Sequence, residues 1–144
     1  MFNSKIKLFT RNILETGTFT VTGNPDSGYP EARLHDREIS LYWKDASESL
    51  VNFVVDQGAS PLAVDALIIS GHNFSGSDIA WQWSDDNVTW YDAVDVWMQS
   101  DNLQIVKILT TALTKRYWRI LLGNVVVTST TTTTSSSSTT TTTA

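Results

Sequence analysis

The stretch "IISGHNFSGSDIAWQWSDDNVTW", residues 68–90, holds the pattern that decides the fold. Its middle part, "DIAWQWS", alternates large apolar residues with small or polar ones. In an extended strand, Ile79, Trp81 and Trp83 therefore point to one side and the residues between them point to the other. A shift of one residue would turn two indoles into water, so the register of this strand is strongly specified.

The same alternation recurs along the chain, and Thr, Val, Ile, Trp and Tyr dominate the alternating segments, as a pleated surface prefers. Roughly nine short strands separated by turn residues are typical of an antiparallel sandwich. We therefore predict an all-β protein, a jelly-roll-like antiparallel β-sandwich, with one helical turn near "SPLAVD" at residues 60–65. The predicted strands are residues 5–9, 17–23, 38–43, 50–56, 64–70, 78–84, 89–94, 103–109 and 116–122.

The last of these strands, "RYWRILL", adds a third tryptophan to the predicted core. Trp118 shares a face with Ile120 and Leu122, while Arg119 lies on the opposite, wetter face. Each buried indole removes about 150–250 Å² from water. We assign Trp81, Trp83 and Trp118 to the core.

Length and composition limit the kinds of protein that this chain can be. A chain of 144 residues fits one domain with a real core. The absence of cysteine excludes disulfides and thiolate chemistry. No apolar run reaches the roughly 20 residues of a membrane span, so we expect no membrane partner. "MFNSKIKLFT" at the start lacks the apolar core of a signal peptide, so we expect a mature N-terminus.

Charge is distributed unevenly. Residues 45–106 carry ten acids and no Lys or Arg, whereas residues 107–144 carry four bases and no acid. An acidic surface repels phosphate backbones, so we expect no nucleic-acid partner. The acidic loops could attract a cation, but a solvated rim that keeps the protein soluble is the favoured interpretation.

The C-terminus differs in kind from the rest. Residues 128–143 are only Ser and Thr, so we divide the chain into a sandwich domain, residues 1–124 with N-terminal strands in 1–28, and an arm, residues 125–144. Such a run has no apolar side chains to bury and resembles a solvated tail or a glycosylated stalk. Since Thr is β-branched and the run follows "NVVV", we hypothesise that the arm pairs as an added strand with a neighbouring subunit.

No catalytic or metal-binding motif is present. His72 and Asn73 follow a buried strand and are predicted to hydrogen-bond the turn, with ligand contact as the alternative. His35 is the only other histidine, and G-x-S-x-G and metal-spaced histidine motifs are absent. Asp85, Asp86 and Asn87 are predicted to cap a hairpin turn. They lack the spaced oxygen ligands of a calcium loop, so we expect neither metal, cofactor nor catalysis.

Aromatic residues outside the predicted core are the candidates for contact with a ligand or another protein. Four of them qualify: Trp43, Trp90, Tyr91 and Trp97. Trp97 lies in "DAVDVWMQSDN" beside Met98, a context typical of an interface anchor. For each of these four residues, packing on the core remains the alternative.

Together these segments resemble the galactose-binding-domain-like (discoidin-like) β-sandwiches, especially those of bacteriophage tail and other virion proteins. The resemblance covers roughly residues 29–123 and rests on four segments. These are "YPEARLHDREISLYW", "VDALIISGHNF", "IAWQWSDDNVTW" and "KRYWRILL".

Two functions follow as hypotheses. The resemblance implies a non-catalytic structural protein of a virion, which packs against copies of itself or other virion proteins through the arm. The alternative is a carbohydrate-binding module, extracellular or at the cell surface, that attaches to cell-surface glycan, with the Ser/Thr run as a linker or stalk. An enzyme is the weakest hypothesis, because fold does not confer chemistry and no site is evident.

Overall fold

Most of the alternating segments that the structure describes form strands. In the computed structural model, which describes residues 11–24, 26–34, 43–45, 50–123 and 125, the all-β prediction is confirmed. The predicted strand at residues 5–9, most of the one at 38–43, His35 and nearly all of the arm lie outside the described residues. The long strands are β1 (Thr18–Thr22), β2 (Val51–Asp56), β3 (Ala63–Ile69), β4 (Asp78–Ser84), β7 (Ile105–Thr114) and β8 (Tyr117–Gly123).

The remaining elements are short. They are the 3-10 helices η1 (Ile13–Glu15) and η2 (Glu31–Leu34) and the two-residue strands β5 (Tyr91–Asp92) and β6 (Trp97–Met98). The predicted strand at 89–94 is thus reduced to β5, and the predicted loop around Trp97 contains a strand. None of the described helices has the length and apolar character needed to cross a membrane.

The helical turn predicted at residues 60–65 is wrong. Strand β3 begins at Ala63, and Val64 pairs with Leu113 of β7. Val64 is also buried in the core, with 8% of its surface exposed. Burial and ladder pairing of this β-branched residue outweigh the weak local helical pattern.

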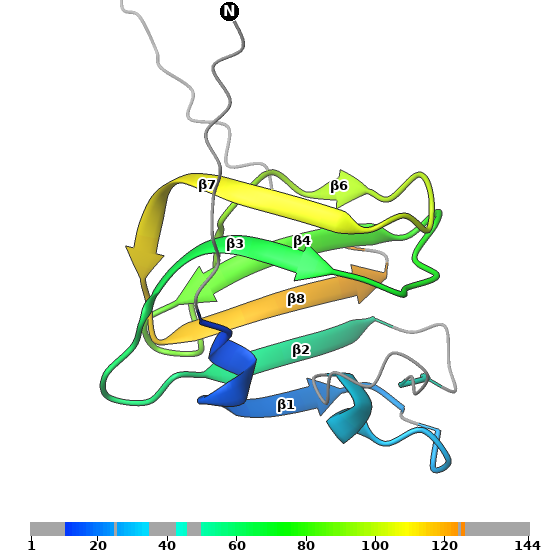
Figure 1. The fold of residues 1–144 in the computed structure, drawn as a ribbon, viewed down its shortest axis with the longest axis horizontal. Helices are drawn as coiled ribbons and strands as arrows, with labels where there is room; N and C mark the ends of the chain where they lie inside the picture. The colour runs from blue at the N-terminus through cyan, green and yellow to red at the C-terminus, as the bar shows by residue number, and fades with distance from the viewer. Residues whose placement is uncertain (1–10, 25, 35–42, 46–49, 124, 126–144) are drawn as a thin grey trace, which may run out of the picture.

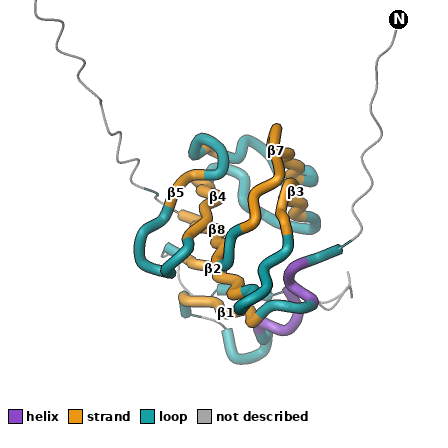
Figure 2. Tube along the Cα trace, turned by 90° about the vertical axis from the view of Figure 1, so that its left-hand side faces the viewer, coloured by secondary structure: helices purple, strands orange, loops and turns teal. Residues whose placement is uncertain are grey.

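The strands form two antiparallel layers. The larger sheet has the order β1-β2-β8-β4-β5, with β6 also paired to β4, and the smaller consists of β3 and β7. Figure 1 shows β3 and β7 crossing in front of the larger sheet, and Figure 2 shows the two layers from the side. Strand β8 therefore lies in the middle of the larger sheet, between β2 and β4.

The core lies between the layers. Val64 and Leu109 of the small sheet meet Trp81 and Trp118 of the large sheet, whose ring centroids are 5.4 Å apart. Each of these buried indoles contributes about 4–6 kcal/mol of hydrophobic stabilisation before entropy is counted. Trp83 is half-buried and packs against this cluster, so all three tryptophans assigned to the core contact it.

Gln57 joins the two chain segments that cross between the layers at one end of the sandwich. Its side-chain nitrogen donates to the carbonyl oxygens of Leu62 and Lys115, at 3.2 and 3.0 Å. Its oxygen accepts from the backbone N–H of Leu62 at 3.0 Å. One amide thus holds the β2–β3 connection against the β7–β8 turn, which fixes where β8 enters the large sheet.

Candidate functional site

The outer face of the large sheet carries a row of side chains that crosses five strands. Thr20 of β1 pairs with Val54 of β2, and Val54 pairs with Arg119 of β8. Arg119 pairs with Gln82 of β4, and Gln82 pairs with Asp92 of β5. Because side chains in one row of a sheet point to the same side, these five face away from the core.

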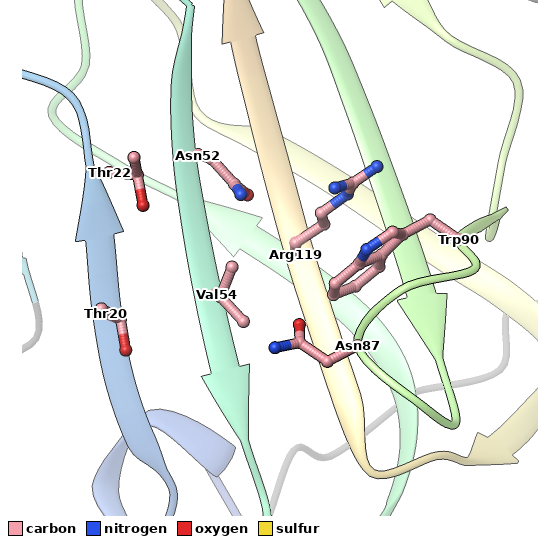
Figure 3. Close-up of a pocket in the computed structure, with 7 residues that line it drawn as sticks. All are labelled: Thr20, Thr22, Asn52, Val54, Asn87, Trp90 and Arg119. Atoms are coloured by element: carbon pink, nitrogen blue, oxygen red, sulfur yellow. The ribbon is translucent and has the colours of Figure 1, made fainter.

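This row borders a pocket of about 320 Å³ on the outer face. Figure 3 shows side chains from β1, β2 and β8 and from the loop after β4 around it. The volume lies at the lower end of the range for small-molecule sites. Its lining residues are mostly polar: Thr20, Thr22, Asn52, Val54, Asn87, Trp90 and Arg119.

Arg119 is held in place from two sides. Its Nε donates to Oε1 of Gln82 at 2.7 Å, and Nε2 of Gln82 donates to Oδ1 of Asp92 at 2.7 Å. The guanidinium carbon lies 4.1 Å from the centroid of the Trp90 ring, in cation–π contact. Burial lowers the pKa of Arg119, and the nearby Asp92 carboxylate opposes that shift. Arginine nevertheless stays protonated, so the pocket holds a fixed positive charge.

The loop after β4 is a tightly bonded turn. Oδ1 of Asp86 accepts from the backbone N–H groups of Val88 and Thr89 and from the Ser84 hydroxyl, at 2.8–2.9 Å. The bonds to Thr89, Val88 and Ser84 lower the pKa of Asp86 to about 2. Asn87 has a positive φ of 61°, which asparagine tolerates better than most residues. The prediction of a capped hairpin turn is confirmed for Asp86, whereas Asp85 accepts instead from Nζ of Lys115 at 2.8 Å. The turn places Asn87 and Trp90 at the pocket.

Asn52 supplies an unusual polar group to the same pocket. Its Oδ1 is buried and has no hydrogen-bond donor among the described residues. An unpaired buried acceptor costs about 1–3 kcal/mol. A ligand hydroxyl that reached this oxygen, after a small rotation of the amide, would recover part of that free energy.

Trp90 is the one predicted contact residue that the structure places in the pocket. Its neighbour Tyr91 is 50% exposed and stacks on Trp83 at 4.6 Å between ring centroids. In strand β5, Tyr91 pairs with the inward-facing Trp83, whereas Asp92 pairs with the outward-facing Gln82. Of these two adjacent aromatic residues, Trp90 therefore lines the pocket, whereas Tyr91 packs on Trp83 away from it.

Trp43 and Trp97 pack on the core and lie outside the pocket. The Trp43 ring meets the edge of Phe53 at 5.3 Å, and its Nε1 is buried without an acceptor among the described residues. Trp97 is half-buried against the core cluster, beneath the Lys107 ammonium at 4.2 Å. For these two residues the structure favours the alternative that the sequence left open, packing on the core.

His72 fixes a loop, as the sequence predicted. Its Nδ1 accepts from the backbone N–H of Phe74 at 3.2 Å, and its Nε2 lies 2.6 Å from the carbonyl oxygen of Leu103. Since that oxygen can only accept, Nε2 carries the proton and donates. Asn73 beside it is exposed. Both residues lie in the β3–β4 loop and line no part of the pocket.

Five polar lining residues were missed as site residues: Arg119, Asn52, Thr20, Thr22 and Asn87, the last of which was predicted only as a turn residue. The alternation in β8 could have indicated Arg119, because a charged residue between the inward-facing Trp118 and Ile120 must point to the outer face of the sheet. Nothing in the sequence indicated that β1 and β2 would bring their outward residues next to it. Among the described residues, no group of three or more His, Cys, Asp or Glu could hold a metal ion.

The described lining of the pocket offers groups for hydrogen bonding and stacking. The residues that line it include a single titratable side chain, Arg119, which remains charged. No acid and base pair of the kind that hydrolysis needs occurs among the described residues that line it. It offers amide, hydroxyl and guanidinium groups for hydrogen bonds beside one indole, an arrangement suited to a small polar ligand.

No protein-family profile matches the sequence, and no curated protein matches it by sequence. Several solved structures share its fold. The chitosan-binding module 1 of a chitosanase/glucanase from Paenibacillus sp. IK-5 has a TM-score of 0.65 and 20% identity, over 78% of this chain and 86% of that one.

Two further similar structures were solved with sugars bound. Module 2 of the same Paenibacillus enzyme, in complex with chitotriose, has a TM-score of 0.63 and 12% identity over 78% of this chain and 87% of that one. A CBM32-4 module produced by Clostridium perfringens, in complex with GlcNAc-α-1,4-galactose, has a TM-score of 0.59 and 15% identity over 85% of each chain. The two-layer sandwich, its strand order and these matches together establish that the chain has the galactose-binding-domain-like (discoidin-like) β-sandwich fold.

Proposed function

We propose that this protein is a non-catalytic carbohydrate-binding module, which acts outside the cell or at its surface and holds sugar in the pocket on the outer face of the large sheet. The observation that carries the proposal is the meeting of Trp90, Arg119 and neutral polar side chains around about 320 Å³. A sugar ring presents hydroxyl groups at its rim and C–H groups on its faces. A site for it needs both hydrogen-bonding groups and an apolar surface.

Each lining residue has a role in this proposal. The part of the Trp90 indole that the guanidinium leaves uncovered provides the apolar surface. The Asn87 amide and the hydroxyls of Thr20 and Thr22 exchange hydrogen bonds with sugar hydroxyls. These side chains project from strands and from a turn braced by Asp86, so little conformational entropy is lost on binding.

The comparisons support a sugar ligand in general terms. Two modules of this fold from one Paenibacillus enzyme are a chitosan-binding module and a module solved with chitotriose, and a third, from Clostridium perfringens, was solved with GlcNAc-α-1,4-galactose. Fold alone does not transfer a ligand, because function lies in the site. The support for this chain therefore comes from the chemistry of its own pocket.

Glycan-array screening followed by titration calorimetry tests the proposal. Trp90→Ala should weaken the best ligand at least about tenfold, since a central aromatic anchor typically costs more than 1.4 kcal/mol when truncated. Tyr91→Ala is the matched control, because it removes a neighbouring exposed aromatic that stacks on Trp83 away from the pocket. Absence of binding to every glycan, or loss of binding in the control alone, would refute the proposal.

The virion-subunit hypothesis has no support from these comparisons. Its proposed assembly contact involves residues 125–144, of which only Val125 is described, so pairing of the arm with a neighbouring subunit stays a prediction. Light scattering on the full chain and on a form ending at Asn124 would test it. If both forms are monomeric at high concentration, assembly through the arm is wrong.

A further inference from the structure

The charge of the pocket indicates which class of sugar it takes. Of the seven described residues that line it, Arg119 alone is charged and the other six are neutral. Nε of the guanidinium is occupied by Gln82, whereas the terminal nitrogens have no hydrogen-bond acceptor among the described residues. Among those residues, no carboxylate forms an ion pair with Arg119 either.

The nearby acids on the same face are already engaged. Asp92 accepts from Gln82, whose amide lies between that carboxylate and Arg119. Asp56 is bound by Arg116 through two bonds, Nε to Oδ1 at 2.8 Å and Nη2 to Oδ2 at 3.0 Å. Asp92 acts on Arg119 at a distance, with the Gln82 amide between them, so the terminal nitrogens remain open to a ligand anion.

The orientation of the Arg119 guanidinium is also fixed before a ligand binds. Contact with Trp90 at 4.1 Å and the bond to Gln82 at 2.7 Å fix its plane and its rotation. A planar guanidinium with free terminal nitrogens matches a carboxylate in two parallel hydrogen bonds. Because Arg119 is half-buried, such a pair is less screened by water than one on an open surface.

We infer that the pocket recognises a carboxylate-bearing sugar, with the carboxylate on the terminal nitrogens of Arg119 and the ring bordered by Trp90, Asn87 and Thr20. This inference rests on the proposed function and specifies its ligand. Uronic acids and sialic acids both carry this group on a pyranose ring. Their shared chemistry defines the class, and the experiment distinguishes the two sources.

The test compares matched ligands on the whole protein. Oligoglucuronate, oligogalacturonate and sialyllactose are each titrated beside the same sugar after reduction of its carboxyl groups to alcohols. We expect at least one carboxylated ligand to bind about tenfold or more tightly than its neutral counterpart, with an affinity that falls as salt is raised. The pair that shows this preference identifies the source of the carboxylate.

Variants locate the preference at Arg119. Arg119→Gln should remove the preference for the carboxylated ligand, and Arg119→Lys, which keeps the charge but not the fork, should retain only part of it. Arg116→Gln is the control, because it removes an exposed arginine near the same face whose bonds go to Asp56. Thermal unfolding of each variant checks that the fold is intact.

The outcomes separate this inference from the proposed function. Equal or tighter binding of neutral or sulfated sugars by the wild-type protein would overturn the inference and leave carbohydrate binding standing. Loss of the preference in Arg116→Gln but not in Arg119→Gln would also overturn it. Failure of the wild-type protein to bind any sugar would overturn both.

Discussion

Ser84 is the residue whose loss should best reveal how the sheet holds the pocket loop. It ends β4, its side chain is fully buried, and its hydroxyl makes three hydrogen bonds. The hydroxyl donates to Oδ1 of Asp86 at 2.9 Å and accepts from the backbone N–H groups of Asp86 and Asn87 at 3.2 and 2.9 Å. Ser84→Ala removes all three bonds without changing the size of the residue appreciably.

The expected loss of stability is about 1–3 kcal/mol. Each intramolecular hydrogen bond contributes roughly 0.5–1.5 kcal/mol net, so three independent bonds would contribute roughly 1.5–4.5 kcal/mol. Asp86 keeps its bonds to Val88 and Thr89, and water can reach the freed N–H groups of the exposed turn, so the full sum is not lost. Ser75→Ala, which removes an exposed hydroxyl bonded to the Ser100 carbonyl, should cost less than about 0.5 kcal/mol.

Urea denaturation followed by tryptophan fluorescence measures both variants. Amide hydrogen exchange provides a local readout, since Asp86 and Asn87 should exchange faster in Ser84→Ala while residues of β2 are unchanged. If Ser84→Ala is no more destabilising than Ser75→Ala and the turn keeps its protection, the hydroxyl does not brace the loop. The account of how Trp90 is positioned would then be wrong.

Three further predictions concern the sandwich itself. Ile79→Val, at a side chain with 0% exposure, should cost about 0.5–1.5 kcal/mol in urea denaturation, whereas Ile68→Val, at 45% exposure, should change stability by less than about 0.5 kcal/mol; equal effects would contradict the assigned core. The pKa of Asp86 is lowered from 3.8 to about 2, so its charge stabilises the folded state above about pH 4 and that contribution is lost as the pH falls through about 2. Asp86→Asn should therefore be less stable than wild type at neutral pH and converge with it near pH 2, and a constant difference across the titration would disprove this. Gly17→Ala should destabilise by about 1–3 kcal/mol in thermal unfolding, because the new Cβ would lie 2.8 Å from Cγ1 of Val55; an unchanged melting temperature would show that β2 gives way freely.

The fold was largely predictable because it follows from a local pattern. Alternation in "DIAWQWS" and "RYWRILL" predicted strands whose observed bounds, Asp78–Ser84 and Tyr117–Gly123, differ by at most one residue. The pattern was weaker where pairing is short. Strands β5 and β6 each contain two residues, too few for a period of two to be recognised.

The site was predictable only in part. Trp90 was identified because it is an aromatic residue outside the predicted core. Asn52 and Thr20, by contrast, belong to strands whose outward side chains look like ordinary solvated positions. They become part of a pocket only because β1 and β2 pair beside β8.

The sequence by itself determined that the chain forms strands, which side of each strand is apolar, and which turn follows β4. These properties depend on neighbours within a few residues, where the alternation of side chains and the hydrogen bonds of Asx residues act. Only the tertiary structure decided that Arg119 stands between Gln82 and Trp90, with Asn52 on the adjacent strand. Residues 52 and 119 are far apart in the chain, and the order of strands that joins them results from packing the whole core, which no local segment encodes.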